Sequence, residues 1–253
     1  MKITFLGTGT SQGVPVIGCE CEVCRSLDYR DKRLRVSVLL EIEGTSLVID
    51  TGPDFRQQML RERITKLDAV LLTHSHKDHI AGLDDVRAFN FLQEKGMPLY
   101  GTTSTLDQVK KEFYYAFETQ KYPGTPILNL KELTGGEFEI DGIKILPLPV
   151  QHLRMPVLGF RIGDFSYITD ANFIPEETLS KLKGTKVLVL NALQKGKHIS
   201  HFNLEEAIAQ AGAIGAEQTY FTHISHKMGL HQSVSKELPE AVALAHDGLT
   251  VTL

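Results

Sequence analysis

The strongest signal in this chain is the sequence T-H-S-H-K-D-H at residues 73–79. It follows the short apolar run 69–73, and α/β proteins place their chemistry at the carboxyl ends of such strands. Its potential metal ligands are His74, His76, Asp78 and His79. Imidazole and carboxylate groups are the usual ligands of zinc, manganese and iron, and a packed core would not accept four such groups on one loop. This stretch therefore predicts a metal site at the end of a buried strand.

Three further polar residues follow apolar runs in the same way. His152 follows ILPLPVQ, Asp170 follows SYIT, and His223 follows TYFT. Each residue alone is more typical of a cap or a turn. Because all three occur at successive strand ends after residues 73–79, together they indicate further ligands of the same metal site.

The composition is that of an ordinary water-soluble globular protein. The chain has 253 residues, 42% hydrophobic residues and a net charge of −4, so no global basic field favours nucleic acid or an anionic membrane. No stretch is long and apolar enough for a membrane helix, and the start lacks the features of a signal peptide. The clustered cysteines and the lack of a signal suggest a reducing cytoplasm, with a Cys19–Cys21 or Cys21–Cys24 disulfide as the alternative.

Apolar runs and turn residues predict alternating strands and helices. Strands are expected at 3–7, 69–73, 98–101, 187–191, 218–222 and 249–253, with hairpins at 36–52, 138–150 and 157–170. Helices are expected at 53–63, 82–96, about 104–117, 175–184, 203–213 and 233–246, with segment 117–136 as a surface excursion near the site. Hairpins precede βα units twice along the chain. This order predicts an α/β fold of two similar halves, in which two mixed β-sheets face each other inside a single domain, 1–253, with helices outside.

The ligand pattern resembles that of the metallo-β-lactamase superfamily, in which H-x-H-x-D-H is followed in order by His, Asp and His. The resemblance covers nearly the whole chain. It implies a four-layer αβ/βα sandwich with a dinuclear metal site at one edge. It also implies that His74, His76 and His152 hold one metal, that Asp78, His79 and His223 hold the other, and that Asp170 bridges both.

The resemblance also suggests a role for Asp50, at the end of the run SLVID. In the superfamily, a carboxylate at this position lies behind the ligands and orients a ligand histidine. The alternative is a turn-forming aspartate before Thr51 and Gly52, and the sequence leaves both readings open.

All three cysteines lie in GCECEVC, residues 18–24, and a closed zinc site needs four ligands. Together with LGTGTSQGVPVIG before it and THISH near the end, this motif resembles the phosphoribosyl 1,2-cyclic phosphate phosphodiesterase branch. That resemblance implies a structural zinc held by Cys19, Cys21, Cys24 and His226. The glycines of GTGTSQG, residues 7–13, then favour a tight turn leading into this zinc site over a phosphate cradle.

The branch resemblance implies hydrolysis of a small phosphodiester, a cyclic ribose phosphate among them, by a hydroxide shared between two divalent ions. The catalytic pair would be manganese or zinc, since His/Asp sites accept both. Asp78 and Asp170 would belong to the catalytic machinery, and His201 would protonate the leaving oxygen as general acid. The alternative for His201 is an exposed residue beside the helix that starts at Asn203.

Other activities of the same fold remain as alternatives. A tRNA 3′-processing endonuclease is less favoured, because it needs a basic arm, and Lys110, Lys111 and Lys121 are offset by Glu112, Glu118 and Glu132. A lactonase or thioesterase would accept an uncharged ester. A redox di-iron protein is disfavoured, because such proteins of this fold typically carry Glu where His76 stands. A metal-dependent binding module is disfavoured, because all seven catalytic ligands are present. The resemblance also suggests a homodimer.

Several basic residues are candidates for substrate binding. The basic residues close in sequence to the ligands are Lys77, Arg154, Lys195, Lys197 and Lys227. They are candidates for holding an anionic substrate. His198 receives no role, and His231 and His246 are expected at the surface.

Overall fold

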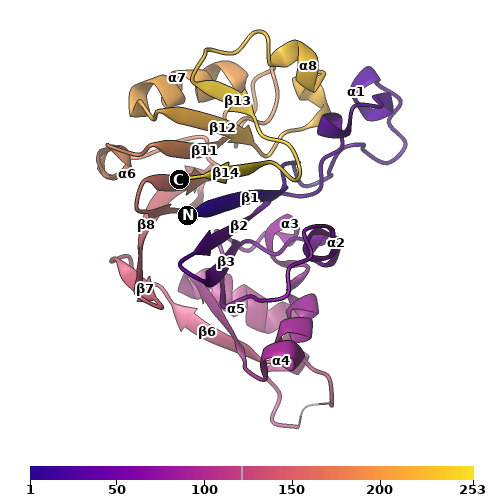
Figure 1. The fold of residues 1–253 in the computed structure, drawn as a ribbon, viewed down its shortest axis with the longest axis vertical. Helices are drawn as coiled ribbons and strands as arrows, with labels where there is room; N and C mark the ends of the chain where they lie inside the picture. The colour runs from indigo at the N-terminus through magenta and orange to yellow at the C-terminus, as the bar shows by residue number, and fades with distance from the viewer. Residues whose placement is uncertain (121) are drawn as a thin grey trace.

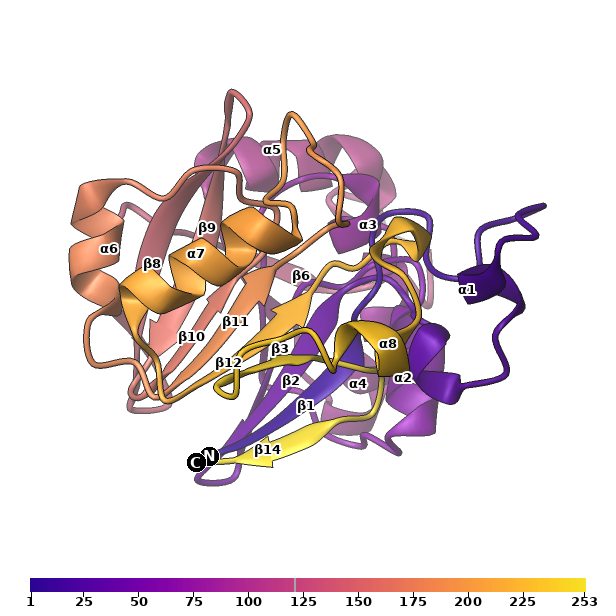
Figure 2. The same ribbon diagram turned by 90° about the horizontal axis from the view of Figure 1, so that it is seen from above.

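The computed structural model describes residues 1–120 and 122–253, so Lys121 lies outside the described residues. Two seven-stranded mixed sheets pack face to face, and helices cover both outer faces (Figures 1 and 2). This arrangement is the expected four-layer αβ/βα sandwich. No described helix has the length and apolar character needed to cross a membrane.

The first sheet contains the N-terminal strands and the last strand of the chain. Its order is β14 (Thr250–Thr252), β1 (Lys2–Gly7), β2 (Ser37–Ile42), β3 (Thr45–Ile49), β4 (Ala69–Leu71), β5 (Met97–Gly101) and β6 (Leu128–Glu132). Because β14 pairs antiparallel with β1, the two termini lie side by side, and the Met1 amino group donates to the Leu253 carbonyl at 2.8 Å (Figure 1).

The second sheet contains the remaining strands. Its order is β13 (Val242–Leu244), β12 (Gln218–Thr222), β11 (Val187–Asn191), β10 (Phe165–Ile168), β9 (Met155–Ile162), β8 (Ile143–His152) and β7 (Phe138–Ile140). Strands β10 to β13 are parallel, and β7 to β10 are joined by antiparallel pairings.

Alternating side chains divide each strand between two cores. In β11, Val187 and Val189 face the central core between the sheets, whereas Leu188 and Leu190 face the helices. All five residues of this strand are buried, which explains its continuous apolar sequence VLVLN. In β3, Leu47 likewise belongs to the central core, whereas the next residue, Val48, faces the helices on the outer side of the sheet.

Helices cover the outer face of each sheet. Over the first sheet lie α2 (Phe55–Arg61), α4 (Arg87–Gln93) and α5 (Thr103–Glu112), and over the second lie α6 (Glu176–Leu182) and α7 (Leu204–Ile214) (Figure 2). The short helices α1 (Glu22–Arg25), α3 (Lys77–Ile80) and α8 (His231–Val234) lie within connecting segments. Helix α7 begins with the expected capping box, because Asn203 and Glu206 each accept a hydrogen bond from the other's backbone N–H.

The hairpin turns follow from residues that tolerate a left-handed backbone. Glu43 and Gly44 have φ of 50° and 86°, and Asp141 and Gly142 have φ of 49° and 80°. Both turns lie within the predicted hairpins 36–52 and 138–150, and positive φ at both positions is the requirement of a type I′ two-residue loop.

Three element predictions need correction. The expected helix 233–246 is wrong, because α8 ends at Val234 and Val242–Leu244 forms strand β13 beside β12. Pro239 removes a helical N–H donor and disfavours helix at the residue before it. Segment 117–136 is not purely a surface excursion, since β6 pairs with β5 at the sheet edge. The helix at 82–96 ends at Gln93 and closes on Glu94 in a left-handed conformation.

Candidate metal centres

The candidate metal site lies where strands of both sheets end. Asp50 follows β3, Asp170 follows β10 and His223 follows β12, and their φ angles are +62°, +53° and +56°. Residues other than glycine rarely adopt this conformation, and it concentrates at functional sites. The strained turns point these three side chains into the same region as residues 74–79, which follow β4.

One buried group contains Asp78, His79, Asp170 and His223. The Nε2 atom of His79 lies 3.3 Å from Oδ2 of Asp78 and 3.4 Å from Oδ1 of Asp170. The Nε2 atom of His223 lies 3.5 Å and 3.2 Å from the same two oxygens. Two imidazole nitrogens and two carboxylate oxygens therefore converge on one point.

A second group contains His74, His76 and Asp170. The Nε2 atom of His74 lies 3.8 Å from Oδ2 of Asp170, and the rings of His74 and His76 are 4.6 Å apart. His152 lies next to this group, with its ring 5.3 Å from that of His76, and its ligand atom lies within 4.8 Å of those of Asp170 and His201. The structure thus brings together all seven residues that the sequence predicts as catalytic metal ligands.

Asp170 lies at the centre of both groups. Its Oδ1 faces His79 and His223, whereas its Oδ2 faces His74 and lies 3.3 Å from Nε2 of His201. Burial alone would raise the pKa of Asp170, but the neighbouring His223 and His79 hold it well below its usual value. The carboxylate is therefore ionised, with one oxygen available to each side.

The donor set fits a pair of divalent cations. The Nε2 atoms of His74, His79 and His223 are buried and form no hydrogen bond with any described residue. Buried polar atoms are normally satisfied, so three unpaired imidazole nitrogens beside two carboxylates indicate a missing positive partner. Burial also lowers the pKa of His74 well below its usual value, which favours the neutral, metal-binding form of the imidazole.

Two residues outside the predicted set hold ligand histidines in place. Thr73 donates its backbone N–H and its hydroxyl to the Asp50 carboxylate, each at 2.8 Å, and this carboxylate contacts Nδ1 of His79 at 2.6 Å. The Ser200 carbonyl accepts from Nδ1 of His152 at 2.7 Å, which directs the other ring nitrogen toward the site. Thr73 directly precedes the first ligand in the sequence, whereas no local pattern marks Ser200.

His201 is buried beside the ligands and is not an exposed residue at the helix start. Its Nε2 lies 3.3 Å from Oδ2 of Asp170, and its exposed fraction is 8%. Burial lowers the pKa of His201 to about 4. Its neighbour His198 is exposed, with its Nδ1 3.3 Å from that of His201.

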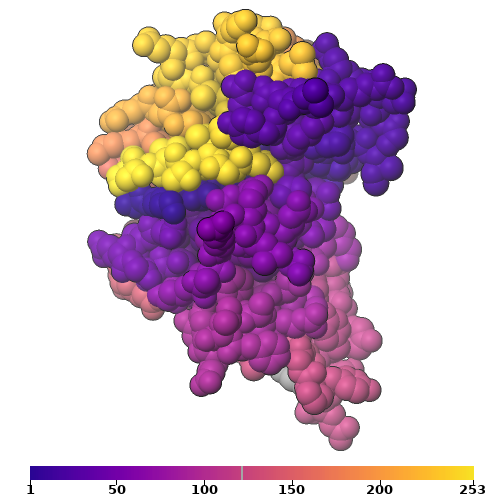
Figure 3. All heavy atoms as spheres, turned by 45° about the vertical axis from the view of Figure 1, so that its right-hand side comes forward, coloured from indigo at the N-terminus to yellow at the C-terminus, as the bar shows by residue number. Residues whose placement is uncertain are grey.

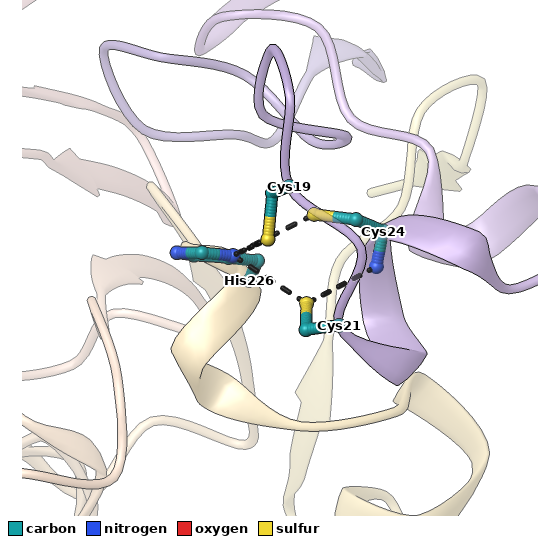
Figure 4. Close-up of side chains that lie close together, drawn as sticks. All are labelled: Cys19, Cys21, Cys24 and His226. Carbon is teal, nitrogen blue, oxygen red and sulfur yellow. Dashed lines mark hydrogen bonds between the residues drawn. The ribbon is translucent and has the colours of Figure 1, made fainter.

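The three cysteines converge on His226 and form a separate cluster, hereafter the cysteine cluster (Figure 4). Their Sγ atoms lie at 3.2 Å, 3.5 Å and 3.5 Å from Nδ1 of His226. All three thiols are free, so the alternative disulfide is wrong. The N-terminal segment that carries them (indigo) lies against the C-terminal segment (yellow) and projects from the molecule (Figure 3).

The electrostatics of the cysteine cluster also fit a cation. The backbone N–H of Cys24 lowers the pKa of Cys21 to about 6, so this sulfur is a thiolate at neutral pH. Burial raises the pKa of the Cys24 thiol to about 11. A bound cation would favour the thiolate form of Cys24 against this effect of burial, and Cys3His is a common ligand set for structural zinc.

His231 is buried, not at the surface as the sequence suggests. Its Nδ1 lies 3.1 Å from Nη2 of Arg33, and its backbone N–H donates to Asp31 at 2.8 Å. His246 is partly buried, with its ring edge-on to Tyr29. These contacts join the N-terminal loop to the segment around α8.

Comparison with known proteins places this site in a family. Residues 45–224 match the Beta-lactamase superfamily domain. A solved structure described as a new diphosphatase from the PhnP family is 41% identical, covers 99% of this chain and 96% of its own chain, and superposes with a TM-score of 0.93. The chain belongs to the β-lactamase superfamily and to its PhnP-like branch. The domain is accordingly a metal-dependent hydrolase by family.

Other relatives carry different names. An octanoyltransferase of Porphyromonas gingivalis is 41% identical over 98% of this chain, but the chain spans only about half (51%) of that protein. A ribonuclease Z of Mycobacterium marinum is 28% identical over 88% of this chain and 86% of its own length. Zinc-bound PqqB from Methylobacterium extorquens is 21% identical, covers 100% of both chains and has a TM-score of 0.79, which shows a shared fold.

Proposed function

We propose that this domain hydrolyses a small phosphodiester with the help of two divalent metal ions, manganese or zinc, and carries a separate structural zinc. The observation that carries the proposal is the position of Asp170. One of its oxygens faces His79 and His223, and the other faces His74. A carboxylate placed between two sets of imidazoles is suited to bridge two cations.

The seven proposed ligands divide between two metal ions. His74, His76 and His152 would hold one ion, Asp78, His79 and His223 would hold the other, and Asp170 would contact both. When bound, such an ion pair lowers the pKa of a water nucleophile and neutralises charge on a phosphoryl group. Asp50 and the Ser200 carbonyl orient the imidazoles of His79 and His152, so that the ligand nitrogens are already placed before substrate binds.

His201 is the proposed general acid. Its Nε2 lies 3.3 Å from Oδ2 of Asp170 at the centre of the site, where the imidazole would face a substrate bound there. The pKa of about 4 makes the imidazole neutral at pH 7 in the absence of substrate. An anionic substrate stabilises the protonated imidazole, so its binding would favour uptake from solvent of the proton that His201 then transfers to the leaving oxygen.

A small phosphodiester, with cyclic ribose phosphates as candidates, is favoured over other substrates of the fold. The solved structure that is 41% identical over nearly the whole chain is described as a diphosphatase, which also acts at phosphorus. The ribonuclease Z likeness is weaker, at 28% identity. Acyl transfer, the activity in the name of the Porphyromonas relative, is not proposed for this domain, because all three cysteines lie in the cysteine cluster and the His/Asp groups suit hydrolysis.

The test combines metal analysis with a substrate panel. We expect three metals per chain, one of which survives a mild chelator, and turnover of cyclic and linear phosphodiesters, including a ribose 1,2-cyclic phosphate. Asp170→Ala should lose the catalytic metal pair and the turnover of bis-p-nitrophenyl phosphate, whereas Asp164→Asn, at an exposed position, should keep both. If the purified Asp170→Ala variant hydrolysed bis-p-nitrophenyl phosphate at the parent rate, the assignment of Asp170 as the bridging ligand would be refuted. Salt-dependent tRNA binding in a gel shift would favour the nuclease, and turnover of uncharged esters alone would favour a lactonase or thioesterase.

A further inference from the structure

Three large apolar side chains are exposed on connections that carry residues of the candidate catalytic site. These side chains, hereafter the apolar rim, are Leu153, Phe173 and Ile199, with exposed fractions of 53%, 58% and 75%. They lie one residue after His152, three residues after Asp170 and two residues before His201, respectively. Single exposed apolar residues are common on protein surfaces, but a group of them beside one site indicates a binding surface.

The side chain of Asn172 ties the three connections together. Its Nδ2 donates to the Ile199 carbonyl at 3.1 Å, and its Oδ1 accepts from the Leu153 N–H at 2.7 Å. Phe173 is the next residue in the chain, and its carbonyl accepts from the Gln151 N–H at 3.0 Å. The β8–β9 connection and the segment between β11 and α7 project from the same edge of the molecule (Figure 2). The backbone positions of the apolar rim are therefore fixed relative to one another.

The apolar rim flanks two imidazoles at one side of the site. The rings of His152 and His201 lie 4.5 Å apart. The Ser200 carbonyl, which lies between Ile199 and His201 in the chain, accepts from Nδ1 of His152 at 2.7 Å. The chain therefore passes from the rim directly to these imidazoles in both connections, at Leu153 and at Ile199.

Leu153 has a backbone conformation that does not suit its side chain. Its φ is +57°, and it occupies the first position of the two-residue turn between β8 and β9. Leucine is strained in this left-handed region, which asparagine and glycine tolerate. Because about half of the side chain is exposed, packing within the chain offsets little of this strain. Strained residues concentrate at functional sites, so a contact with a bound ligand explains a leucine here better than folding does.

We infer that the apolar rim is a specificity-determining surface that packs against an apolar or aromatic group of the substrate, attached to the phosphoryl group that the site holds. The inference rests on the proposed function and deepens it, because it names the chemical class of the organic part of the substrate. Ligand sites typically combine a few polar anchors with apolar walls. Here the His/Asp groups anchor the phosphoryl group, and the apolar rim, with the aromatic ring of Phe173, supplies the wall.

The test measures the binding of two phosphate monoesters that differ by one phenyl ring. The probes are ethyl phosphate and 2-phenylethyl phosphate, each titrated by calorimetry into the metal-loaded wild-type protein. We expect 2-phenylethyl phosphate to bind about tenfold more tightly, since partial burial of a phenyl ring contributes about that much. Phe173→Ala should remove most of this difference and leave the affinity for ethyl phosphate unchanged.

Leu153→Asn is a second variant that separates binding from folding. Asparagine lacks the apolar side chain but tolerates positive φ, so the difference between the probes should shrink while the urea midpoint stays the same or rises. The matched control is Phe91→Ala, since Phe91 is exposed to a similar extent, at 65%, but lies on α4 over the outer face of the first sheet. It should keep the wild-type difference. Metal content is measured for every variant and should not change.

The possible failures are distinguishable. If the wild-type protein hydrolyses phosphodiesters but binds both monoesters equally, or if Phe173→Ala and Leu153→Asn keep the wild-type difference, the inference is overturned while the proposed function stands. If Phe173→Ala keeps the difference but changes the molecular mass in solution, the apolar rim is a contact between two copies of the chain, and the inference is again overturned. If the metal-loaded wild-type protein binds neither monoester and turns over no phosphodiester of the panel, the proposed function fails and the inference fails with it.

Discussion

The Nδ1 atom of His79 lies 2.6 Å from Oδ2 of Asp50, and both side chains are fully buried. Thr73 occupies both oxygens of the same carboxylate, with its N–H on Oδ1 and its hydroxyl on Oδ2. A carboxylate accepts hydrogen bonds, so the proton of His79 belongs on Nδ1 and its Nε2 is left as the ligand atom. Asp50 also has φ of +62°, so it combines the two roles that the sequence leaves open.

Replacing Asp50 by asparagine separates these two roles. Asparagine tolerates the left-handed turn but is a weaker, neutral acceptor for His79. We therefore expect Asp50→Asn to fold and to bind its catalytic metal about 10–100-fold more weakly, measured by competition with a chelator of known affinity. Asp164→Asn on the surface is the control. Unchanged metal affinity would leave Asp50 with the turn role only.

Replacing His201 by glutamine tests its role as general acid. A 4-nitrophenolate leaves without being protonated, whereas an alkoxide needs a proton. The expected loss in kcat is therefore about 10²–10⁴-fold for a diester with an alkyl leaving group and much smaller for bis-p-nitrophenyl phosphate. Metal content should not change. Equal losses for both substrates, together with lost metal, would instead make His201 a ligand beside His152 and Asp170.

Much of the fold follows from local sequence patterns. The apolar run at 187–191 becomes β11, because a strand buried on both faces favours apolar residues at successive positions, and the run at 218–222 becomes the partly buried β12. Glu43 and Gly44 mark a hairpin turn for an equally local reason. The expected helix at 233–246 does not form, because Pro239 interrupts the local helical pattern and Val242–Leu244 pairs with β12 as β13.

The site was predictable where its ligands follow strands, and less so where contacts join distant segments. His152, Asp170 and His223 each end an apolar run, so their positions in the sequence already place them at one edge of the fold. Burial of His231 depends on Arg33, 198 residues earlier, and no local pattern encodes such a contact. The Ser200 carbonyl behind His152 was missed for the same reason, because any residue can supply a backbone acceptor.

The buried His231 makes stability depend on pH. Burial, followed by the charges of Arg33 and Arg30, lowers its pKa from 6.5 to about 4. In mildly acidic solution the unfolded chain therefore binds a proton at His231 that the folded chain does not. The contribution of the neutral His231 to the free energy of unfolding is complete above pH 6.5 and is lost as pH falls toward 4. We expect the wild-type protein to lose about 2 kcal/mol more than His231→Asn between about pH 7.5 and about pH 5.

Urea unfolding at both pH values measures this difference. Asparagine places an acceptor oxygen near the position of Nδ1, so it preserves the contact with Arg33 without titrating. Loss of zinc in acid lowers the free energy of unfolding of the wild-type protein and of His231→Asn equally, so it cancels when the two pH dependences are compared. Parallel pH profiles for the two proteins would contradict the prediction.

Cys21→Ser tests whether the cysteine cluster supports the catalytic site. Cys21 and His226 lie 205 residues apart, and closing so long a loop restricts the unfolded chain in the way that a disulfide does. His226 also lies three residues after His223 in the catalytic group. We expect the variant to lose its zinc and about 2–4 kcal/mol of unfolding free energy, and to release catalytic metal more readily to a chelator.

The two effects are measured separately on the same preparation, by urea unfolding and by metal analysis during chelator titration. Leu27→Ala, just beyond α1, outside the cluster and fully exposed, is the matched control for a small change in the same loop. A fall in stability with unchanged retention of the catalytic metals would limit the cluster to a structural cross-link. If stability and retention of the catalytic metals fall together, loss of zinc from the cysteine cluster disturbs the catalytic site through the turn from His223 to His226. The backbone between these two histidines is too short for one of them to move without the other.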